Sequence, residues 1–280
     1  MPELPEVESL CRQIAPLLIG ARVIGCELTL PRILRQGSLN DLTSSTILSV
    51  NRIGKFIQIA VDREFSLFIH LRMTGQLFWD PPDRLRDRYT RSIVFTDRGS
   101  LYFRDVRSLG GFWICQHGQF PWKRMGIDPL AKNFDIDFLQ GCLSRKKLPV
   151  KVLLLDQSLI AGIGNIYASE ILFKATINPQ RQACSITNVE AKRLHRSIRR
   201  ILQSAIDAQG TTFRDFRLSD GREGAFQEFL KVYGHEGDPC RKCSTPIIRI
   251  IQSARSAYYC PKCQPLLDRA SLDAVIPAQA

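Results

Sequence analysis

Residues 240–263 read CRKCSTPIIRIIQSARSAYYCPKC, and this stretch decides the fold of the last part of the chain. Cys240 and Cys243 form one close pair, and Cys260 and Cys263 form a second pair after 16 intervening residues. Each Cys-x2-Cys pair closes a tight turn, and four thiolates give a closed tetrahedral site for Zn²⁺. Because all four ligand positions come from the protein, the spacing predicts one structural zinc ion without a catalytic role. Two disulfide bonds are the alternative, which a cytosolic location disfavours.

The segment between the two cysteine pairs predicts a β-hairpin. Residues 246–252 and 257–260 have the apolar and β-branched composition of strands, and residues 253–256 form the turn between them. Arg255 lies in this turn, where a rigid hairpin can present a basic side chain to a phosphate or a groove of a duplex. An exposed turn residue without such a role is the alternative.

Upstream of this hairpin, the sequence after Asp128-Pro129 has helical periodicity. Four helices are expected: residues 136–143, 150–155, 166–175 and 187–209. In the last one, Thr187 and Glu190 predict a capping box, and the face opposite the apolar stripe is basic. At the entry to the third, residues 159–166 read LIAGIGNI, in which two glycines allow close backbone approach and Asn165 is the expected N-cap.

Residues 21–115 instead have the pattern of many short strands, which is typical of a sandwich or a barrel. The expected strands are residues 22–30, 47–61, 65–78, 92–95 and 100–103. Asp97-Arg98-Gly99 predicts a hairpin turn between the last two. With helices dominating after residue 130, the sequence predicts an α+β chain of two domains that meet near residues 125–135.

The N-terminus, MPELPEVE, combines a small second residue with three carboxylates. Pro2 favours removal of Met1, which would expose a secondary amine that is nucleophilic near neutral pH. Glu3 and Glu6 are candidate general acid–base groups beside it. Residues 4–18 are expected to form an amphipathic helix that begins with Pro5 in its first turn. A terminus without function, followed by acids that cap the helix, is the alternative.

The composition favours a globular protein with a polyanionic partner. The 280 residues include 39 Lys and Arg against 27 Asp and Glu, a net charge of +12. No apolar run approaches the ~18 residues that span a bilayer, and the acidic N-terminus is unlike a signal peptide. We therefore expect a cytoplasmic location and no association with a membrane.

Taken together, the motifs resemble the bacterial formamidopyrimidine-DNA glycosylase family over about residues 1–264. The shared motifs are MPELPEVE, RIGKF around Lys55, HLRMTG at 70–75, GIGNIYASEILF at 162–173, SDG at 219–221 and the four cysteines. The resemblance implies an N-terminal catalytic β-sandwich with flanking helices (1–130), a helix–two-turn–helix module (131–230) and a zinc finger (231–265). Residues 266–280 have no assigned role.

The resemblance also implies an activity, which is excision of oxidised purines (8-oxoguanine and formamidopyrimidine) followed by β,δ-elimination at the abasic site. The partner would be double-stranded DNA with oxidised bases or abasic sites, bound by a monomer. Pro2 would be the Schiff-base nucleophile, Glu3 the proton donor and Glu6 a further acidic group. Lys55 would transfer protons in β-elimination and Arg255 would serve δ-elimination.

Further residues match DNA-contacting positions of this family. His70, Asn165, Lys146, Lys151 and Arg88 correspond to DNA-backbone or basic DNA-binding positions, and the family often has His where Arg88 stands. Ser219 and Phe226 belong to the segment that resembles the base-recognition loop. Met73, Arg107 and Leu109 match the three residues that fill the gap left by an extruded base.

The sequence departs from the family at this gap-filling motif. Residues 105–110 read DVRSLG, where the family usually has Asp-Pro-Arg-Arg-Phe-Gly. Leu109 therefore replaces a ring that stacks on bases. The ranking of lesions and the preference for the opposite base remain open.

Two other functions fit parts of the sequence. A sister class of glycosylases removes oxidised pyrimidines, but it typically has Gly in place of Leu4 and lacks the Met–Arg pair. The other is a DNA-damage binder or a zinc-finger regulator that kept the fold without enzymatic activity, but such a protein would not need Pro2, Glu3 and Lys55 together.

Overall fold

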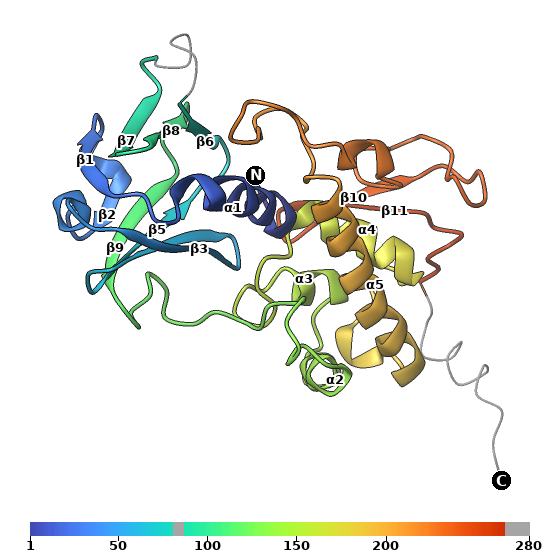
Figure 1. Cartoon of the computed structure of the whole chain (residues 1–280). Helices are drawn as coiled ribbons and strands as arrows, with labels where there is room; N and C mark the ends of the chain where they lie inside the picture. Colours follow the sequence, from blue (N-terminus) through green and yellow to red (C-terminus); the bar gives the residue numbers. More distant parts are fainter. Residues whose placement is uncertain (81–86, 267–280) are drawn as a thin grey trace. The chain divides into compact units, whose positions relative to one another are not determined.

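The structure, a computed structural model, describes residues 1–80 and 87–266 of the chain (Figure 1). Packing divides the described residues into two units: residues 1–124 with 204–228, and residues 125–203 with 229–266. The modules expected at 1–130, 131–230 and 231–265 remain a prediction. Apart from Leu266, the expected tail at 266–280 lies outside the described residues.

Helix α1 (Leu4–Leu18) confirms the helix that the N-terminal pattern predicts. It begins after Glu3 because Pro5 fits the first turn and the Glu6 carboxylate accepts a hydrogen bond from the Glu3 N–H at 2.7 Å. Its apolar side chains at helical spacing are fully buried, and four of them pack in one cluster with the strands of the first unit: Val7, Leu10, Ile14 and Leu18.

Two β-sheets make up most of residues 19–124 in the first unit. One has the order β1 (Val23–Leu28), β7 (Thr90–Thr96), β8 (Gly99–Asp105) and β6 (Gly75–Trp79). The other has the order β2 (Leu34–Gln36), β9 (Gly111–Gln116), β5 (Phe65–His70), β4 (Phe56–Val61) and β3 (Ile47–Ile53). Short 3-10 helices, η1 (Pro31–Ile33) and η2 (Leu39–Leu42), connect β1, β2 and β3. All the pairings are antiparallel except that of β2 with β9.

Both sheets and α1 contribute to one hydrophobic core. Strand β7 alternates buried and half-buried residues, as expected for a strand with one face on a core. Val94 and Phe103 from one sheet lie in the same apolar cluster as Ile57 and Ile69 from the other. This arrangement confirms the predicted β-sandwich.

Two of the expected strands prove to be pairs of strands. Residues 47–61 fold into β3 and β4 around a turn at Gly54 and Lys55, and Gly54 adopts the positive φ of 60° that such tight turns favour. Residues 65–78 break between β5 and β6, so that the chain passes from one sheet to the other. A β-carbon on Gly75 would lie 2.5 Å from the Leu71 carbonyl oxygen, so this crossing requires glycine. The expected turn between β7 and β8 is confirmed.

The second unit contains the four predicted helices. They are α2 (Ile136–Ser144), α3 (Val150–Leu154), α4 (Asn165–Ala175) and α5 (Asn188–Asp207), of which the end belongs to the first unit. A 3-10 turn, η4 (Ala183–Ser185), precedes α5, and η5 (Phe226–Phe229) follows it. The capping box is confirmed, since the Glu190 N–H donates to Thr187 Oγ1 at 3.3 Å and the Glu190 carboxylate accepts from the Thr187 N–H at 2.9 Å.

The predicted hairpin is present as β10 (Ile248–Gln252) and β11 (Arg255–Tyr259), and β11 packs beside α4 (Figure 1). Ser253 and Ala254 form the turn with φ of 49° and 59°, so Arg255 begins the second strand directly after the tip. Across the described ranges, no helix has the length and apolarity needed to cross a membrane.

Candidate functional site

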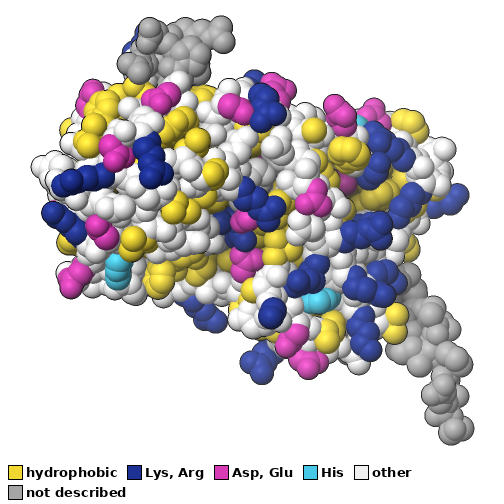
Figure 2. Space-filling view, in the orientation of Figure 1, with side chains coloured by type: hydrophobic (Ala, Val, Ile, Leu, Met, Phe, Trp, Pro, Cys, Tyr) yellow, Lys and Arg dark blue, Asp and Glu magenta, His cyan; other side chains and the backbone are white. Residues whose placement is uncertain are grey.

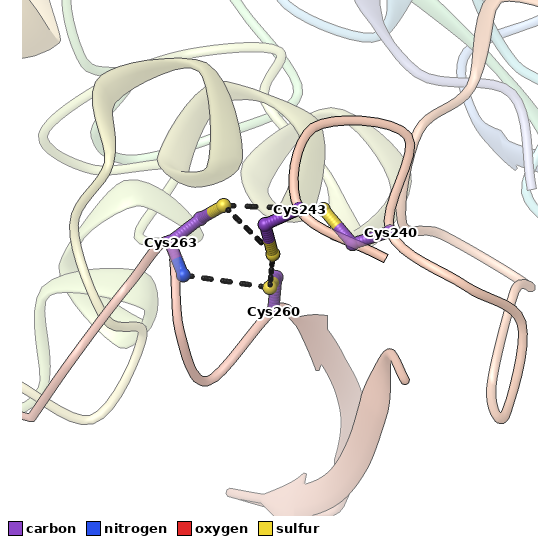
Figure 3. Close-up of side chains that lie close together, drawn as sticks. All are labelled: Cys240, Cys243, Cys260 and Cys263. Atoms are coloured by element: carbon purple, nitrogen blue, oxygen red, sulfur yellow. Dashed lines mark hydrogen bonds between the residues drawn. The ribbon is translucent and has the colours of Figure 1, made fainter. Parts of the chain in front are cut away.

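Four cysteine side chains converge beside the β10–β11 hairpin (Figure 3). Cys240, Cys243, Cys260 and Cys263 place their Sγ atoms within 4.8 Å of one another. The Cys243 Sγ lies 3.4 Å from the Cys260 Sγ and 3.5 Å from the Cys263 Sγ. Zinc–sulfur bonds of about 2.3 Å in a tetrahedron place sulfur atoms about 3.8 Å apart. The sulfurs thus have tetrahedral spacing, and the alternative of disulfide bonds is not realised.

The chemistry of these thiols also fits a zinc ion. Hydrogen bonds with Thr245 lower the pKa of Cys243 to about 6, whereas burial and the neighbouring sulfurs raise the pKa of Cys263 to about 12. A bound Zn²⁺ would hold all four groups as thiolates. The backbone N–H groups of Lys242 and Cys263 each donate to a cysteine sulfur at 3.4 Å, which favours the anionic form.

The cysteine cluster packs directly on α4. Cys240 and Cys260 share an apolar cluster with Phe173 of that helix, and the Lys242 ammonium lies 4.7 Å from the centre of the Phe173 ring. Buried Gln264 donates to the Ile177 carbonyl and accepts from the Cys260 N–H, so it joins the finger to the loop after α4. Glu170 accepts from the N–H groups of residues 231–233, and burial raises its pKa. Loss of the metal would therefore disturb the helices as well as the hairpin.

The N-terminal residues lie in the first unit, and the three candidate catalytic residues among them are buried. Pro2, Glu3 and Glu6 are buried, whereas Met1 is 52% exposed. The Glu6 Oε2 accepts from the Glu3 N–H at 2.7 Å, and its Oε1 accepts from the Thr211 N–H at 2.8 Å. One carboxylate thus joins the start of the chain to the segment after α5. After removal of Met1, the Pro2 amine would begin a buried segment that the Glu6 carboxylate holds through its hydrogen bonds to Glu3 and Thr211.

Lys55 and His70 lie together at one end of the second sheet. Lys55 occupies the β3–β4 turn and is buried, and the next residue, Phe56, pairs with His70. Burial, aided by the charges of Arg72 and Lys55, lowers the pKa of His70 to about 3. The His70 Nδ1 accepts the Arg72 N–H at 2.9 Å, so in the neutral ring the proton resides on Nε2. At neutral pH His70 would meet a phosphate as an uncharged N–H donor.

The three gap-filling candidates lie at the surface of the first unit. Met73 is 44% exposed and Leu109 is 42% exposed, and Arg107 between β8 and β9 is exposed as well. The Arg107 Nη1 lies 3.3 Å from the Met73 sulfur, so the structure brings these two residues together across 34 positions of sequence. The sequence motifs indicated all three residues as gap-filling candidates, but they did not predict the contact between Met73 and Arg107.

The segment that follows α5 is anchored to the sandwich. Ser219 is buried, and its N–H and hydroxyl donate to the Gln13 Oε1 at 2.9 and 3.1 Å, while its carbonyl accepts from the Trp79 N–H. Phe226 is also buried. Base recognition by Ser219 and Phe226 stays a prediction. In the same segment, the side chains of residues 213–215 are exposed. No local sequence signal marks Gln13, because its partner is 206 positions away.

Lys151 and Asn165 form one hydrogen-bonded group in the second unit. The buried Lys151 Nζ donates to the Asn165 Oδ1 at 2.7 Å and also to the carbonyl oxygen of Ser256. The expected N-cap role of Asn165 is wrong: Gly164 is the N-cap, and Asn165 is the first helical residue, with its side chain on Lys151. Because Ser256 follows Arg255, Lys151 also fixes the strand that presents the exposed Arg255.

The remaining basic candidates are more exposed. Lys146 is half-buried between α2 and α3, and Arg88 is exposed, with its guanidinium 2.8 Å from the Tyr89 hydroxyl. On the face drawn in Figure 2, Lys and Arg side chains gather over the helices and hairpin of the second unit. The basic face of α5 is partly structural, because the Arg199 guanidinium donates to the carbonyl oxygens of residues 129–131.

Comparison with known proteins identifies related families along most of the chain. Residues 1–112 match the formamidopyrimidine-DNA glycosylase N-terminal domain and residues 125–217 match the H2TH domain of the same glycosylase. Residues 237–266 match the zinc finger found in FPG and IleRS.

Whole-chain relatives agree with these matches. A protein named formamidopyrimidine-DNA glycosylase from Pelotomaculum thermopropionicum is 42% identical over 277 residues, which cover 94% of this chain and 99% of the relative. The crystal structure of the MutM (Fpg) protein from Thermus thermophilus superposes with a TM-score of 0.87 at 36% identity, covering 95% of this chain and 100% of that one. A mutant of Lactococcus lactis Fpg in complex with Fapy-dG-containing DNA has a TM-score of 0.89 at 32% identity, with 95% and 100% coverage.

Proposed function

The chain belongs to the formamidopyrimidine-DNA glycosylase family, and from this membership we propose that it is a bifunctional enzyme of base-excision DNA repair. It removes 8-oxoguanine and formamidopyrimidine from duplex DNA and then cleaves the abasic site by β,δ-elimination. It acts as a monomer in the cytoplasm and holds one structural Zn²⁺. The observation that carries this proposal is the burial of Pro2, Glu3 and Glu6 together at the start of the chain, with the Glu6 carboxylate bound to the Glu3 N–H.

The proposed chemistry begins at the Pro2 nitrogen. The amine forms a bond to the sugar C1′, the bond from C1′ to the damaged base breaks, and Glu3 donates a proton to the sugar as its ring opens. The resulting iminium ion acidifies the C2′ hydrogen, so a base can remove it and expel the 3′ phosphate. A second elimination, in which the C4′ hydrogen is lost, expels the 5′ phosphate, and water then hydrolyses the iminium to release the sugar fragment and regenerate the Pro2 amine. Lys55 and Arg255 transfer protons in the two eliminations.

DNA contacts come from both units in this proposal. His70 donates its Nε2 proton to a backbone phosphate, and Arg88 supplies a cationic donor on the same unit. Asn165, Lys146, Lys151 and Arg255 bind the DNA backbone from the second unit. The hydrogen bonds that join Lys151 to Asn165 and Ser256 support this assignment, because they hold these groups and the start of β11 as one rigid surface.

The direct test uses duplex oligonucleotides with a single 8-oxoguanine or formamidopyrimidine. The expected products are the excised base and a one-nucleotide gap with phosphate at both ends, which mass spectrometry identifies. Intact strands after prolonged incubation with zinc-loaded protein that lacks Met1 would contradict the proposal.

Arg255→Ala is expected to weaken binding to damaged and undamaged duplexes alike. A single lost phosphate contact should reduce the slope of log affinity against log salt by about one unit. The matched control is Arg249→Ala, because Arg249 lies on the same hairpin but is already engaged by Glu236 and Ser256. The measurement is fluorescence anisotropy over a salt series. A change confined to one lesion would assign Arg255 to base readout.

Leu109 is expected to be a functional but weak wedge. Leu109→Phe should improve single-turnover excision, because stacking of a ring on a base contributes about 1–3 kcal/mol that leucine cannot supply. Leu109→Ala should slow excision. Arg107→Ala should slow excision and also reduce the differences in rate among the four opposite bases, since arginine can read a base edge. If both Leu109 variants match the parent protein, Leu109 does not enter the duplex.

A further inference from the structure

Two surface loops of the first unit meet at one buried carboxylate. The first loop, residues 71–74, joins β5 to β6 and carries Met73; the second, residues 106–110, joins β8 to β9 and carries Arg107 and Leu109. Asp105, the last residue of β8, is fully buried beneath them. Its position suggests a role for Asp105 that neither the motifs nor the proposed chemistry assigns.

A chain of hydrogen bonds runs from one loop to the other through Asp105. The Arg107 N–H donates to Thr74 Oγ1 at 3.1 Å, and the Thr74 hydroxyl donates to Asp105 Oδ1. The other carboxylate oxygen, Oδ2, accepts the Gly110 N–H at 2.7 Å. Asp105 Oδ1 thus holds Thr74, at the end of the first loop, and Thr74 in turn holds Arg107 near the start of the second loop. Asp105 Oδ2 holds Gly110, at the end of the second loop.

The backbone around this carboxylate leaves little freedom. Ser108 adopts a positive φ of 52°, and its N–H donates to the Asp105 carbonyl oxygen at 3.3 Å. A β-carbon on Gly110 would lie 2.6 Å from the Phe103 ring and 3.1 Å from Asp105 Oδ2. The end of the second loop is therefore closely packed against the carboxylate. Thr74 is 7% exposed and Ser108 is 8% exposed, whereas Met73 and Leu109 are more than 40% exposed.

We propose that Asp105 and Thr74 are positioning residues that hold Met73, Arg107 and Leu109 as one rigid wedge. The inference rests on the proposed function, since it concerns how the enzyme enters a duplex. A wedge that is already ordered loses no conformational freedom when it replaces an extruded base. It also keeps Arg107 at a fixed distance from the base left opposite, which discrimination between opposite bases requires.

Thr74→Val is the sharpest test, because it keeps the shape of the side chain and removes the hydroxyl that joins the two loops. Single-turnover excision from duplex DNA should slow at least about tenfold, and the spread of rates over the four opposite bases should narrow. A 2-aminopurine base placed opposite an abasic-site analogue should show a smaller change in fluorescence on binding. Thr74→Ser, which retains the hydroxyl, should restore all three properties.

Cleavage of a single-stranded oligonucleotide with an abasic site separates this inference from the proposed function. That reaction needs the Pro2 amine but no wedge, so Thr74→Val should cleave it within about twofold of the parent rate. The matched control is Thr96→Val, which removes a buried threonine hydroxyl that donates to the Gly99 carbonyl at 2.7 Å in another loop of the same sheet. The range of its excision rates over the four opposite bases should equal that of the parent protein.

Each outcome decides one of the two proposals. If the parent protein does not cleave the single-stranded abasic site, the proposed function fails. The positioning role is overturned by a different result, in which the parent cleaves the single-stranded site but Thr74→Val behaves like Thr96→Val. The two variants would then have the same range of excision rates over the four opposite bases and the same change in 2-aminopurine fluorescence. If Thr74→Val does not fold, Asp105→Asn is judged by the same criteria, because it replaces one accepting oxygen without changing side-chain size.

Discussion

Protein from which Met1 has been removed is expected to form a covalent complex with lesion-containing DNA that borohydride traps, and Pro2→Gly is expected to lose most of it. In the proposed mechanism the secondary amine of Pro2 forms a cationic iminium with C1′, and hydride reduction would make this bond permanent. Substitution by glycine changes both the amine and the backbone at a buried position between Met1 and Glu3. We expect at least about a hundredfold decrease in trapped product, measured by gel shift under denaturing conditions.

Two controls make this result specific. Pro31→Ala removes a proline from η1, away from the N-terminus, and should trap as well as the parent protein. A variant with one additional residue between Met1 and Pro2 keeps every side chain but blocks the amine, so it should not trap. Equal trapping by protein that retains Met1 would exclude Pro2 as the nucleophile.

Removal of zinc is expected to have the second large effect. Cys243→Ser, or chelation of the metal, should lower affinity for duplex DNA at least about a hundredfold, since structural zinc contributes about 10–16 kcal/mol to the folding of isolated zinc-finger peptides. The loss should extend to the helices of the second unit, because Cys240 and Cys260 pack with Phe173 of α4. Most of the β-sandwich should remain folded, since its apolar cluster contains no residue of the finger.

Elemental analysis measures the zinc content, and fluorescence anisotropy with a labelled duplex measures the affinity. Thermal denaturation followed by circular dichroism at a helix-sensitive and a strand-sensitive wavelength measures the unfolding of the two units. Cys184→Ser is the matched control, because Cys184 is an exposed cysteine outside the cluster. It should keep one zinc per chain and full affinity. Active protein that contains no zinc would exclude a structural metal at the four cysteines.

The sequence by itself determined the elements that depend on interactions between near neighbours. Helix α1 has the predicted bounds because its apolar spacing, its proline and its first-turn glutamate all act within a few residues. The capping box of α5 and the spacing of the cysteine pairs are local in the same sense. Patterns of this kind predicted the helices, the four-cysteine cluster and a set of strands typical of a sandwich or a barrel, and the resemblance to a family narrowed the last of these to a sandwich.

Only the tertiary structure decided which distant groups meet, because such contacts depend on the packing of whole sheets and helices. Asn165 has the residue type of an N-cap, yet its side chain binds Lys151, which the fold brings to the start of α4. Ser219 lies in the expected base-recognition segment, yet Gln13 of α1 holds it in the interior. Thr74 and Asp105 are 31 positions apart, and no periodicity links them. A buried carboxylate needs hydrogen-bond donors, and the tertiary structure determines which residues supply them. For Asp105 these donors are Thr74 and Gly110, and through them the fold determines the position of the proposed wedge.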